Sequence, residues 1–468
     1  MKSNILIILF FLIALAICQE DDSGDDTTVL DVSSATESQT TTTALETETT
    51  ASATVESATS ATVSEKEPQP TSTESEMPAV NRTVNPAVCQ SLQQLYKSLN
   101  GNAWIVRTGW DSTDMSTCCS WLLIYEPLAL NANPPSPTTS DLAYNNLVGQ
   151  LPNSFDQLPD LQNIDLSNNN ISGSLPATIA NLASLKSINL DVNSISGDLP
   201  SGLSKLVNLT NIHLKNNSLA GTIPDSWATM KSLENLYLSN NSLTGPFPTV
   251  ITQISSLRSL YLDNNALNGF LPTDLGRASG LIQLNLKGNH LLGNIPASVG
   301  NMTNLQSLVM SHQMLNGSIP EELYSLLKLE VLDLSSNRLT GTLSTKLGQI
   351  VNVKRLNLGH NLITGPIPSQ IDQLTKLEHL SLNFNALNGQ FPSSMAPPAL
   401  GYCYMTPNQF QSCPDQSIIN NPQSLAFQCS VDCIVKDSRK KSNSAAGNSS
   451  NSLTIIVIAM VTAFKFLM

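Results

Sequence analysis

The chain has 468 residues, of which 13% are charged and only 5% are aromatic, and its formal net charge is −13. Fourteen acidic residues and one lysine lie between Glu20 and Val80, and they account for all of this charge. The rest of the chain is electrically balanced, which excludes a general electrostatic attraction to nucleic acid.

The first residues carry a targeting signal. Residues 1–18 combine a basic Lys2 with an apolar stretch and small residues before Gln19, which is typical of a secretory signal peptide. An uncleaved signal anchor is the alternative. Both alternatives predict that the chain enters the secretory pathway and reaches the extracellular face of the plasma membrane or the cell wall.

Residues 19–85 are rich in Ser, Thr and Glu and show no apolar period. Such a segment buries too little apolar surface to fold, so we expect a disordered stalk. Its Ser and Thr density with scattered prolines resembles an O-glycosylated stalk. An unmodified acidic linker is the alternative.

The body of the chain repeats with a fixed period. Eleven glycines from Gly149 to Gly389 recur every 24 residues. Four residues before each glycine stands an asparagine, except at Gln313, and three residues after each stands a proline, except at Ser344. Three columns in phase predict that residues 141–400 form an α/β solenoid of eleven stacked units.

Each column has a physical role. Leu233, Leu236 and Leu238 of one short strand should point into the interior, while the residues between them point outward. These strands pair in parallel into one sheet on the concave face. The asparagine can satisfy buried backbone groups, the glycine permits a tight turn, and the proline sets φ on the opposite side.

The segment Leu219–Pro224, read as Leu-x-Gly-x-Ile-Pro, resembles the plant-type leucine-rich repeat. That family includes receptor-like ectodomains and polygalacturonase-inhibiting proteins. The resemblance covers about residues 86–433 and implies a leucine-rich-repeat superhelix with cysteine-containing caps. It does not identify a ligand, because relatives share the scaffold and differ in what they bind.

Residues 86–140 are expected to form an N-terminal cap with an irregular loop. The Cys-Cys-x-Trp motif that begins at Cys118 resembles the cap of this family, and the resemblance implies a disulfide between Cys89 and Cys118. The family's next cysteine is replaced here by Tyr125, so Cys119 has no evident partner. A genuine variant with an inserted loop and an error in the gene model both explain this departure.

Residues 401–433 are expected to form a C-terminal cap that resembles the cysteine-rich closure of some microbial surface repeat proteins. Its cysteines are Cys403, Cys413, Cys429 and Cys433. Four cysteines allow three pairings, and the sequence does not choose among them. Metal binding is the alternative, although two of the cysteines are far apart and the context is extracellular.

The C-terminus carries a second signal. A polar linker over residues 434–452 precedes residues 453–468, which are apolar but shorter than the ~20 residues of a membrane-spanning helix. Small residues, a polar spacer and an apolar tail together signal a glycosylphosphatidylinositol anchor, and the candidate attachment sites are Ser442, Asn443 and Ser444. A short transmembrane tail is the alternative.

No catalytic motif is present: the sequence lacks a phosphate-binding glycine loop, a His-Glu-x-x-His motif and a nucleophile elbow. We therefore predict a binding protein without catalytic residues, cofactor or metal. Outward positions near the middle of the sheet offer a candidate ligand site, formed by His213, Lys215, Tyr237, Tyr261, Asp263 and Lys287. Aromatic and charged groups on a rigid sheet are typical of interface hot spots, and stacked tyrosines suit a sugar or a peptide. An ordinary sheet face with occasional tyrosines is the alternative.

Asn-x-Ser/Thr sequons mark candidate N-glycosylation sites at Asn81, Asn170, Asn208, Asn216, Asn240, Asn301, Asn316 and Asn448. By the repeat register, Asn216 and Asn240 lie close to the aromatic residues of the candidate site. Glycans there would shield one of its edges.

The leading functional hypothesis is a cell-surface module that recognises an extracellular protein, peptide or glycan. Its contact with the membrane would be the lipid anchor or the short hydrophobic tail, and no nucleic-acid partner is expected. The alternatives are an inhibitor of a secreted cell-wall hydrolase and a structural surface-coat protein.

Overall fold

The computed structural model describes residues 86–112, 118, 139–412 and 414–429. The predicted signal peptide, stalk, polar linker and hydrophobic tail lie outside the described residues. So do the lipid-anchor candidates, Cys119, Cys413, Cys433 and the sequons at Asn81 and Asn448.

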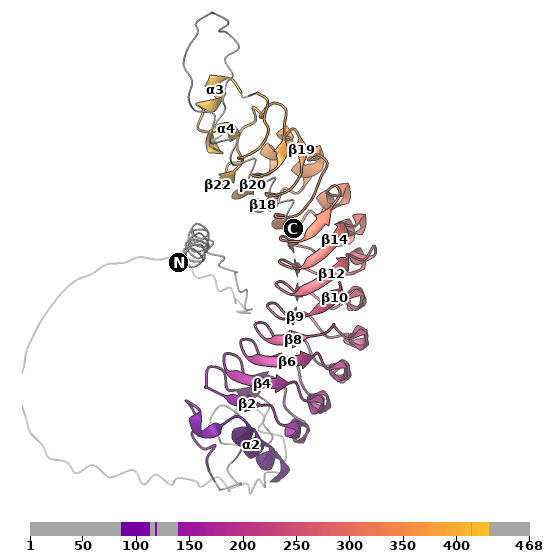
Figure 1. Ribbon diagram of the computed structural model, residues 1–468, viewed down its shortest axis with the longest axis vertical. Helices are drawn as coiled ribbons and strands as arrows, with labels where there is room; N and C mark the ends of the chain where they lie inside the picture. Colours follow the sequence, from indigo (N-terminus) through magenta and orange to yellow (C-terminus); the bar gives the residue numbers. More distant parts are fainter. Residues whose placement is uncertain (1–85, 113–117, 119–138, 413, 430–468) are drawn as a thin grey trace, which may run out of the picture. The chain divides into compact units, whose positions relative to one another are not determined.

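Short parallel strands, one from each repeat, form a twelve-stranded sheet in chain order (Figure 1). The strands are β1 (Thr139–Asp141), β3 (Asn163–Asp165), β5 (Ser187–Asn189), β7 (Asn211–His213), β9 (Asn235–Tyr237), β11 (Ser259–Tyr261), β13 (Gln283–Asn285), β15 (Ser307–Val309), β17 (Val331–Asp333), β18 (Arg355–Asn357), β20 (His379–Ser381) and β22 (Tyr402–Tyr404). We call this the long sheet. Its strands pair one repeat apart, as in Leu260 with Leu284.

A second strand in most repeats forms three smaller parallel sheets beside the long sheet. The first contains β2 (Val148–Gln150), β4 (Asn170–Ser174), β6 (Ser194–Asp198) and β8 (Ser218–Ala220). The second contains β10 (Thr244–Pro246), β12 (Ala266–Phe270), β14 (His290–Asn294) and β16 (Met314–Asn316), and the third contains β19 (Thr364–Gly365) and β21 (Ala386–Leu387).

Short 3-10 helices follow the proline column in all of the repeats except the last, on the side opposite the long sheet (Figure 1). They are η3 (Asn153–Gln157), η4 (Ala177–Asn181), η5 (Ser201–Lys205), η6 (Asp225–Thr229), η7 (Thr249–Gln253), η8 (Leu275–Arg277), η9 (Ala297–Asn301), η10 (Glu321–Ser325), η11 (Thr345–Gln349) and η12 (Ser369–Gln373). Pro296, with φ of −71°, directly precedes η9. Where proline is missing, Ser344 caps η11 instead, because its side chain accepts a hydrogen bond from the Lys346 amide.

The asparagine column binds successive repeats together, as predicted. The Asn289 amide donates to the Leu262 and Leu286 carbonyls at 2.9 and 2.8 Å, while its oxygen accepts from the Leu267 amide at 3.0 Å. The exception, Gln313, uses its longer side chain in the same way and accepts from the Leu291 amide at 2.9 Å. Each of these side chains therefore satisfies backbone groups that would otherwise be buried without partners.

Two positions in each repeat have a left-handed backbone. The glycines of the 24-residue column have positive φ, for example 77° at Gly293, as a position that requires glycine should. In most repeats, however, this glycine lies within the second strand, as Gly293 does in β14, and not in the turn that the sequence predicted. A second position, five residues before each glycine, is also left-handed, with φ of 53° at Asn216 and 55° at Val192. Asparagine tolerates this conformation and a β-branched valine does not, so Val192 is strained.

The N-terminal cap closes the first repeat with α2 (Pro86–Ser98) and η1 (Gly101–Ala103). Trp104 packs edge-on against Trp110 with ring centroids 4.9 Å apart, and its indole N–H donates to the Leu99 carbonyl at 2.8 Å. Cys89 forms a disulfide with Cys118, which confirms the pairing implied by the family resemblance.

The C-terminal cap adds one more unit to the stack. Strand β22 pairs with β20, and Asn408 continues the asparagine column by accepting from the Leu387 amide at 3.0 Å. The long sheet therefore extends one strand beyond the eleven units read from the glycines. Two short helices follow, α3 (Gln416–Ile419) and α4 (Leu425–Gln428). Of the three possible cysteine pairings, the structure contains a Cys403–Cys429 disulfide.

Within the described ranges, no helix combines the length and the apolar character needed to cross a membrane.

Candidate ligand-binding surface

One outward row crosses the first six strands of the long sheet in register. We call it the binding row, and it consists of Asp141, Asp165, Asn189, His213, Tyr237 and Tyr261. Parallel strands in exact phase place these side chains one strand spacing apart, about 4.8 Å. The repeat therefore converts six positions separated by 24 residues in sequence into one continuous line.

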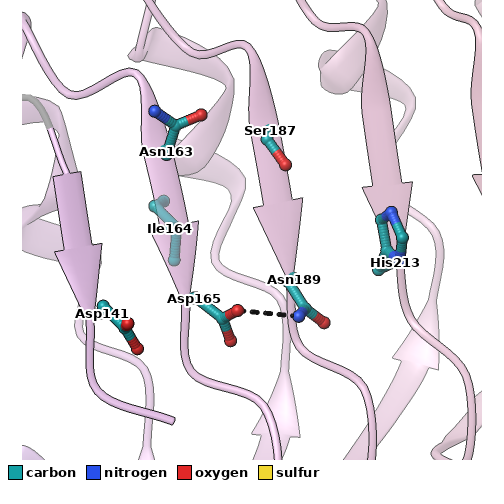
Figure 2. A pocket seen from close by; sticks show the side chains of 7 residues that line it. All are labelled: Asp141, Asn163, Ile164, Asp165, Ser187, Asn189 and His213. Atoms are coloured by element: carbon teal, nitrogen blue, oxygen red, sulfur yellow. Dashed lines mark hydrogen bonds between the residues drawn. The ribbon is translucent and has the colours of Figure 1, made fainter. Parts of the chain in front are cut away.

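The acidic end of the binding row lines a shallow depression of about 370 Å³. Its lining residues are Asp141, Asn163, Ile164, Asp165, Ser187, Asn189 and His213. Figure 2 shows Asp141, Asp165 and Asn189 side by side on neighbouring strands, with His213 beyond them. The Asn189 amide donates to Asp165 Oδ2 at 2.9 Å and the Ser167 backbone N–H donates to Asp165 Oδ1 at 2.9 Å, so both oxygens of this carboxylate already accept one hydrogen bond. This end offers hydrogen-bond acceptors and negative charge to a ligand.

The other end of the binding row is aromatic. The rings of His213 and Tyr237 lie 4.5 Å apart, and those of Tyr237 and Tyr261 lie 5.0 Å apart. The Tyr261 hydroxyl donates to the Gln283 side chain at 3.0 Å, which orients the last ring. The three half-buried rings therefore form a continuous aromatic platform, in which neighbouring rings are tilted against each other.

Asp191 organises the charges beside this platform. Its carboxylate lies 3.5 Å from Lys215 Nζ and 3.8 Å from His213 Nδ1, and it accepts the Lys215 amide at 2.6 Å. The same Lys215 Nζ sits 5.1 Å from the centroid of the Tyr237 ring, within cation–π range. Asp191 was not among the candidate residues, although its column faces outward.

Asp263 lies two residues after Tyr261, in the same outward column as Asp191 and Lys215. Ser239 donates a hydrogen bond to its carboxylate. Burial raises the pKa of Asp263, while the Ser239 hydrogen bond and the positive charges of Lys287 and Lys215 act in the opposite direction. The structure therefore groups His213, Lys215, Tyr237 and Tyr261 closely, and links Asp263 and Lys287 to them through charge.

Sequence reasoning missed Asp141. The strand that carries it begins at Thr139, in a stretch that reads as an irregular loop. Its position eight residues before Gly149, the same offset as Asp165 from Gly173, was the available signal.

A second aromatic group at the C-terminal end of the long sheet was also missed. His379 stacks on Tyr402 at 4.6 Å, and His360 stacks on Phe384 at 4.3 Å. Tyr402 belongs to the additional strand β22, whose repeat register is visible in the sequence only through Asn408.

The described sequon asparagines are all exposed: Asn170, Asn208, Asn216, Asn240, Asn301 and Asn316. Asn216 and Asn240 occupy the left-handed turn that follows strands β7 and β9, which carry His213 and Tyr237. Glycans on these two residues would stand at one end of the strands that bear the platform. Among the residues that the structure describes, no group of three or more His, Cys, Asp or Glu side chains could hold a metal ion.

Comparison with protein families supports the repeat assignment. A family model described as "Leucine rich repeat" matches residues 141–195, 207–267 and 328–387, and a second of the same description matches residues 280–302. No curated protein matches the chain.

Several solved structures of plant proteins are similar to the chain. The leucine-rich-repeat ectodomain of the Arabidopsis thaliana membrane receptor kinase GASSHO1/SCHENGEN3, solved with CASPARIAN STRIP INTEGRITY FACTOR 2, is 35% identical. Its TM-score is 0.58, and the match covers 59% of this chain and 34% of that one. The Arabidopsis receptor kinase HAESA, solved with the peptide hormone IDA and the co-receptor SERK1, is 30% identical. Its TM-score is 0.63, and the match covers 70% of this chain and 54% of that one.

A plant ice-binding protein is 26% identical with a TM-score of 0.55, and the match covers 72% of this chain and 99% of that one. The chain thus spans between about a third and about a half of the length of the two receptor structures. The matched repeats, the asparagine and glycine columns and the parallel long sheet agree with one another. The chain is therefore built from leucine-rich repeats and is similar to the leucine-rich-repeat ectodomains of these plant receptor kinases.

Proposed function

We propose that the chain is an extracellular recognition module that binds an extended peptide along the binding row. The observation that carries this proposal is the continuity of the row: a depression with acceptor groups leads directly into a platform of tilted aromatic rings on the next strands of the same sheet. The receptor kinase HAESA, a structural relative, was solved with a peptide hormone, which supports a peptide as the ligand class.

The dimensions of the row suit a short peptide. Six strands at about 4.8 Å spacing span roughly 24 Å. An extended peptide covers about 3.4 Å per residue, so some seven residues would lie along the row. The acidic end would receive amide and cationic groups of the peptide, and the rings of Tyr237 and Tyr261 would receive apolar or proline side chains.

The signals predicted at the two ends of the chain support a location at the cell surface. The signal peptide would deliver the chain to the cell surface, and a glycosylphosphatidylinositol anchor on Ser442, Asn443 or Ser444 would hold it there. The Ser/Thr-rich stalk would add O-linked sugars at the N-terminal end. Binding, rather than catalysis, is the role we assign to the repeats.

The test of binding is capture from a synthetic peptide library and a glycan array, each exposed to the purified full chain. We expect peptide ligands, and we expect Tyr237→Ala combined with Tyr261→Ala to weaken them at least about tenfold. Asp333→Ala is the matched control, because Asp333 occupies the same outward column outside the binding row. Unchanged affinity in the double variant would refute the site, and capture of glycans alone would refute the ligand class.

The test of anchoring is treatment of intact expressing cells with a phosphatidylinositol-specific phospholipase. Release of the protein into the medium is the expected result. Retention on the cells would favour the short transmembrane tail instead.

A further inference from the structure

Three exposed apolar side chains form a line on the second of the smaller sheets, away from the binding row. Phe270, Leu292 and Met314 are direct partners on neighbouring strands β12, β14 and β16. Their exposed fractions are 69%, 37% and 37%. We call these residues the apolar row. A contiguous apolar line on a soluble protein either marks an interface or promotes aggregation, so something is expected to cover it.

The ring of Phe270 lies close to Gly293 of the next strand, β14. A Cβ atom at Gly293 would stand only 2.5 Å from Phe270 Cδ1, so the glycine is what allows the ring to rest there. Phe270 as a whole remains 69% exposed. Its ring therefore contacts the sheet at Gly293 and is otherwise open to the solvent.

A glycosylation sequon stands beside this ring. Asn316, in Asn316-Gly317-Ser318, is exposed and lies two residues beyond Met314 on β16, so both side chains emerge from the same face of the sheet. Gly293, under the ring, is paired with Leu315, the residue next to Asn316. From a strand spacing of about 4.8 Å and a rise of about 3.4 Å, Asn316 Cα lies roughly 6 Å from Gly293 Cα. A sugar on Asn316 would begin within reach of the ring.

We propose that Asn316 carries an N-linked glycan whose first N-acetylglucosamine covers the apolar row. In the modification, the Asn316 amide nitrogen bonds to the anomeric carbon of N-acetylglucosamine. The bond from that carbon to a lipid-linked diphosphate breaks, the diphosphate leaves with the bonding electrons, and the amide loses one proton. One face of the pyranose exposes C–H groups, which match the electron-rich face of the Phe270 ring and the aliphatic Leu292 and Met314.

Two sequons allow a matched comparison in the full-length chain secreted from a eukaryotic host. Ser318→Ala removes the sequon at Asn316, and Thr303→Ala removes the one at Asn301 at the end of η9, while both asparagines remain. Mass spectrometry reports occupancy, and a dye that fluoresces on apolar surfaces reports exposure of the row. We expect occupied Asn316, an increase of about twofold in dye fluorescence for Ser318→Ala, and no increase for Thr303→Ala.

Phe270→Ala combined with Ser318→Ala should return the fluorescence to the wild-type value, because the ring is the surface that the dye reaches. Glycosidase treatment of the folded wild-type protein should reproduce the increase, which keeps the test independent of the folding of any variant. An unmodified Asn316, unchanged fluorescence after glycan loss, or a wild-type dimer that Phe270→Ala dissociates would each overturn the proposal.

Discussion

Asn289 shows how much one side chain of the asparagine column contributes. It is 3% exposed, and its side chain hydrogen-bonds the Leu286 and Lys287 carbonyls of its own repeat and the Leu262 carbonyl and Leu267 amide of the preceding one. Asn289→Ala leaves these groups without partners, and we expect the free energy of unfolding to fall by about 3 kcal/mol. Chemical denaturation measures this loss. Gln313→Asn is the control: it restores the residue found in the other repeats, so a comparable loss there would contradict the role of the column.

At Asp263, burial and hydrogen bonding act in opposite directions, and burial dominates. A carboxyl whose pKa is raised by folding disfavours the folded state once it ionises. Its stabilising contribution is therefore complete below the ordinary pKa of 3.8 and is lost as the pH rises through the raised value.

Asp263→Asn removes this ionisation and keeps an oxygen for the Ser239 hydrogen bond. We expect the variant to gain stability relative to the wild type as the pH rises above 3.8, and to lose that advantage below it. Unfolding free energies of both proteins across this range give the difference. A pH-independent difference would show that Asp263 does not titrate in this way.

At the scale of one element, the left-handed turn after each long-sheet strand carries a strain that varies between repeats. Its residue is asparagine at Asn168, Asn216 and Asn240, glycine at Gly288, and valine at Val192. A left-handed conformation costs most residues 1–2 kcal/mol, and a β-branched side chain is the least suited to it.

Val192→Gly should therefore stabilise the chain by about 1 kcal/mol, after the greater flexibility of glycine in the unfolded state is subtracted. The thermal unfolding midpoint reports the change. Val207→Gly serves as the control, because Val207 is also exposed but is not among the positive-φ residues. A decrease in stability at both positions would contradict the assignment of strain to Val192.

At the scale of the whole solenoid, the caps determine where unfolding starts. Each repeat contacts mainly its neighbours, so the terminal units have the fewest contacts and depend on added covalent links. The Cys403–Cys429 disulfide connects β22 to the end of α4 across 26 residues. Closing a loop of that length lowers the entropy of the unfolded chain, which stabilises the folded state by about 3.5 kcal/mol.

Cys403→Ser combined with Cys429→Ser should loosen β22 and β20 while leaving the binding row intact. Hydrogen–deuterium exchange by mass spectrometry would show faster exchange over residues 379–404 and unchanged exchange over residues 211–261. Uniformly faster exchange along the chain would instead indicate that the described repeats unfold as one cooperative unit.

The repeat period determines much of this protein from its sequence. A solenoid unit contacts its neighbours in a fixed register, so a column in the sequence is also a line of contacts in space. For that reason the inward leucines, the asparagine column, the glycine column and the neighbouring positions of His213, Tyr237 and Tyr261 in one outward row could be predicted. The Cys89–Cys118 disulfide followed from the family resemblance, which supplies a pairing that spacing alone does not.

Some pairings could be established only from the tertiary structure, because the 24-residue repeat does not predict them. The smaller sheets pair residues 22 apart, as in Leu292 with Met314, and this offset rather than the repeat period brings Phe270 into the apolar row. The Cys403–Cys429 pairing requires that β22 and the end of α4 come close together, with the two Cα atoms 4.8 Å apart, and the spacing of the cysteines does not show this. Strand β1 keeps the 24-residue phase, but it begins in a stretch without the leucine pattern, so the depression around Asp141 was recognised only from the pairing of β1 with β3.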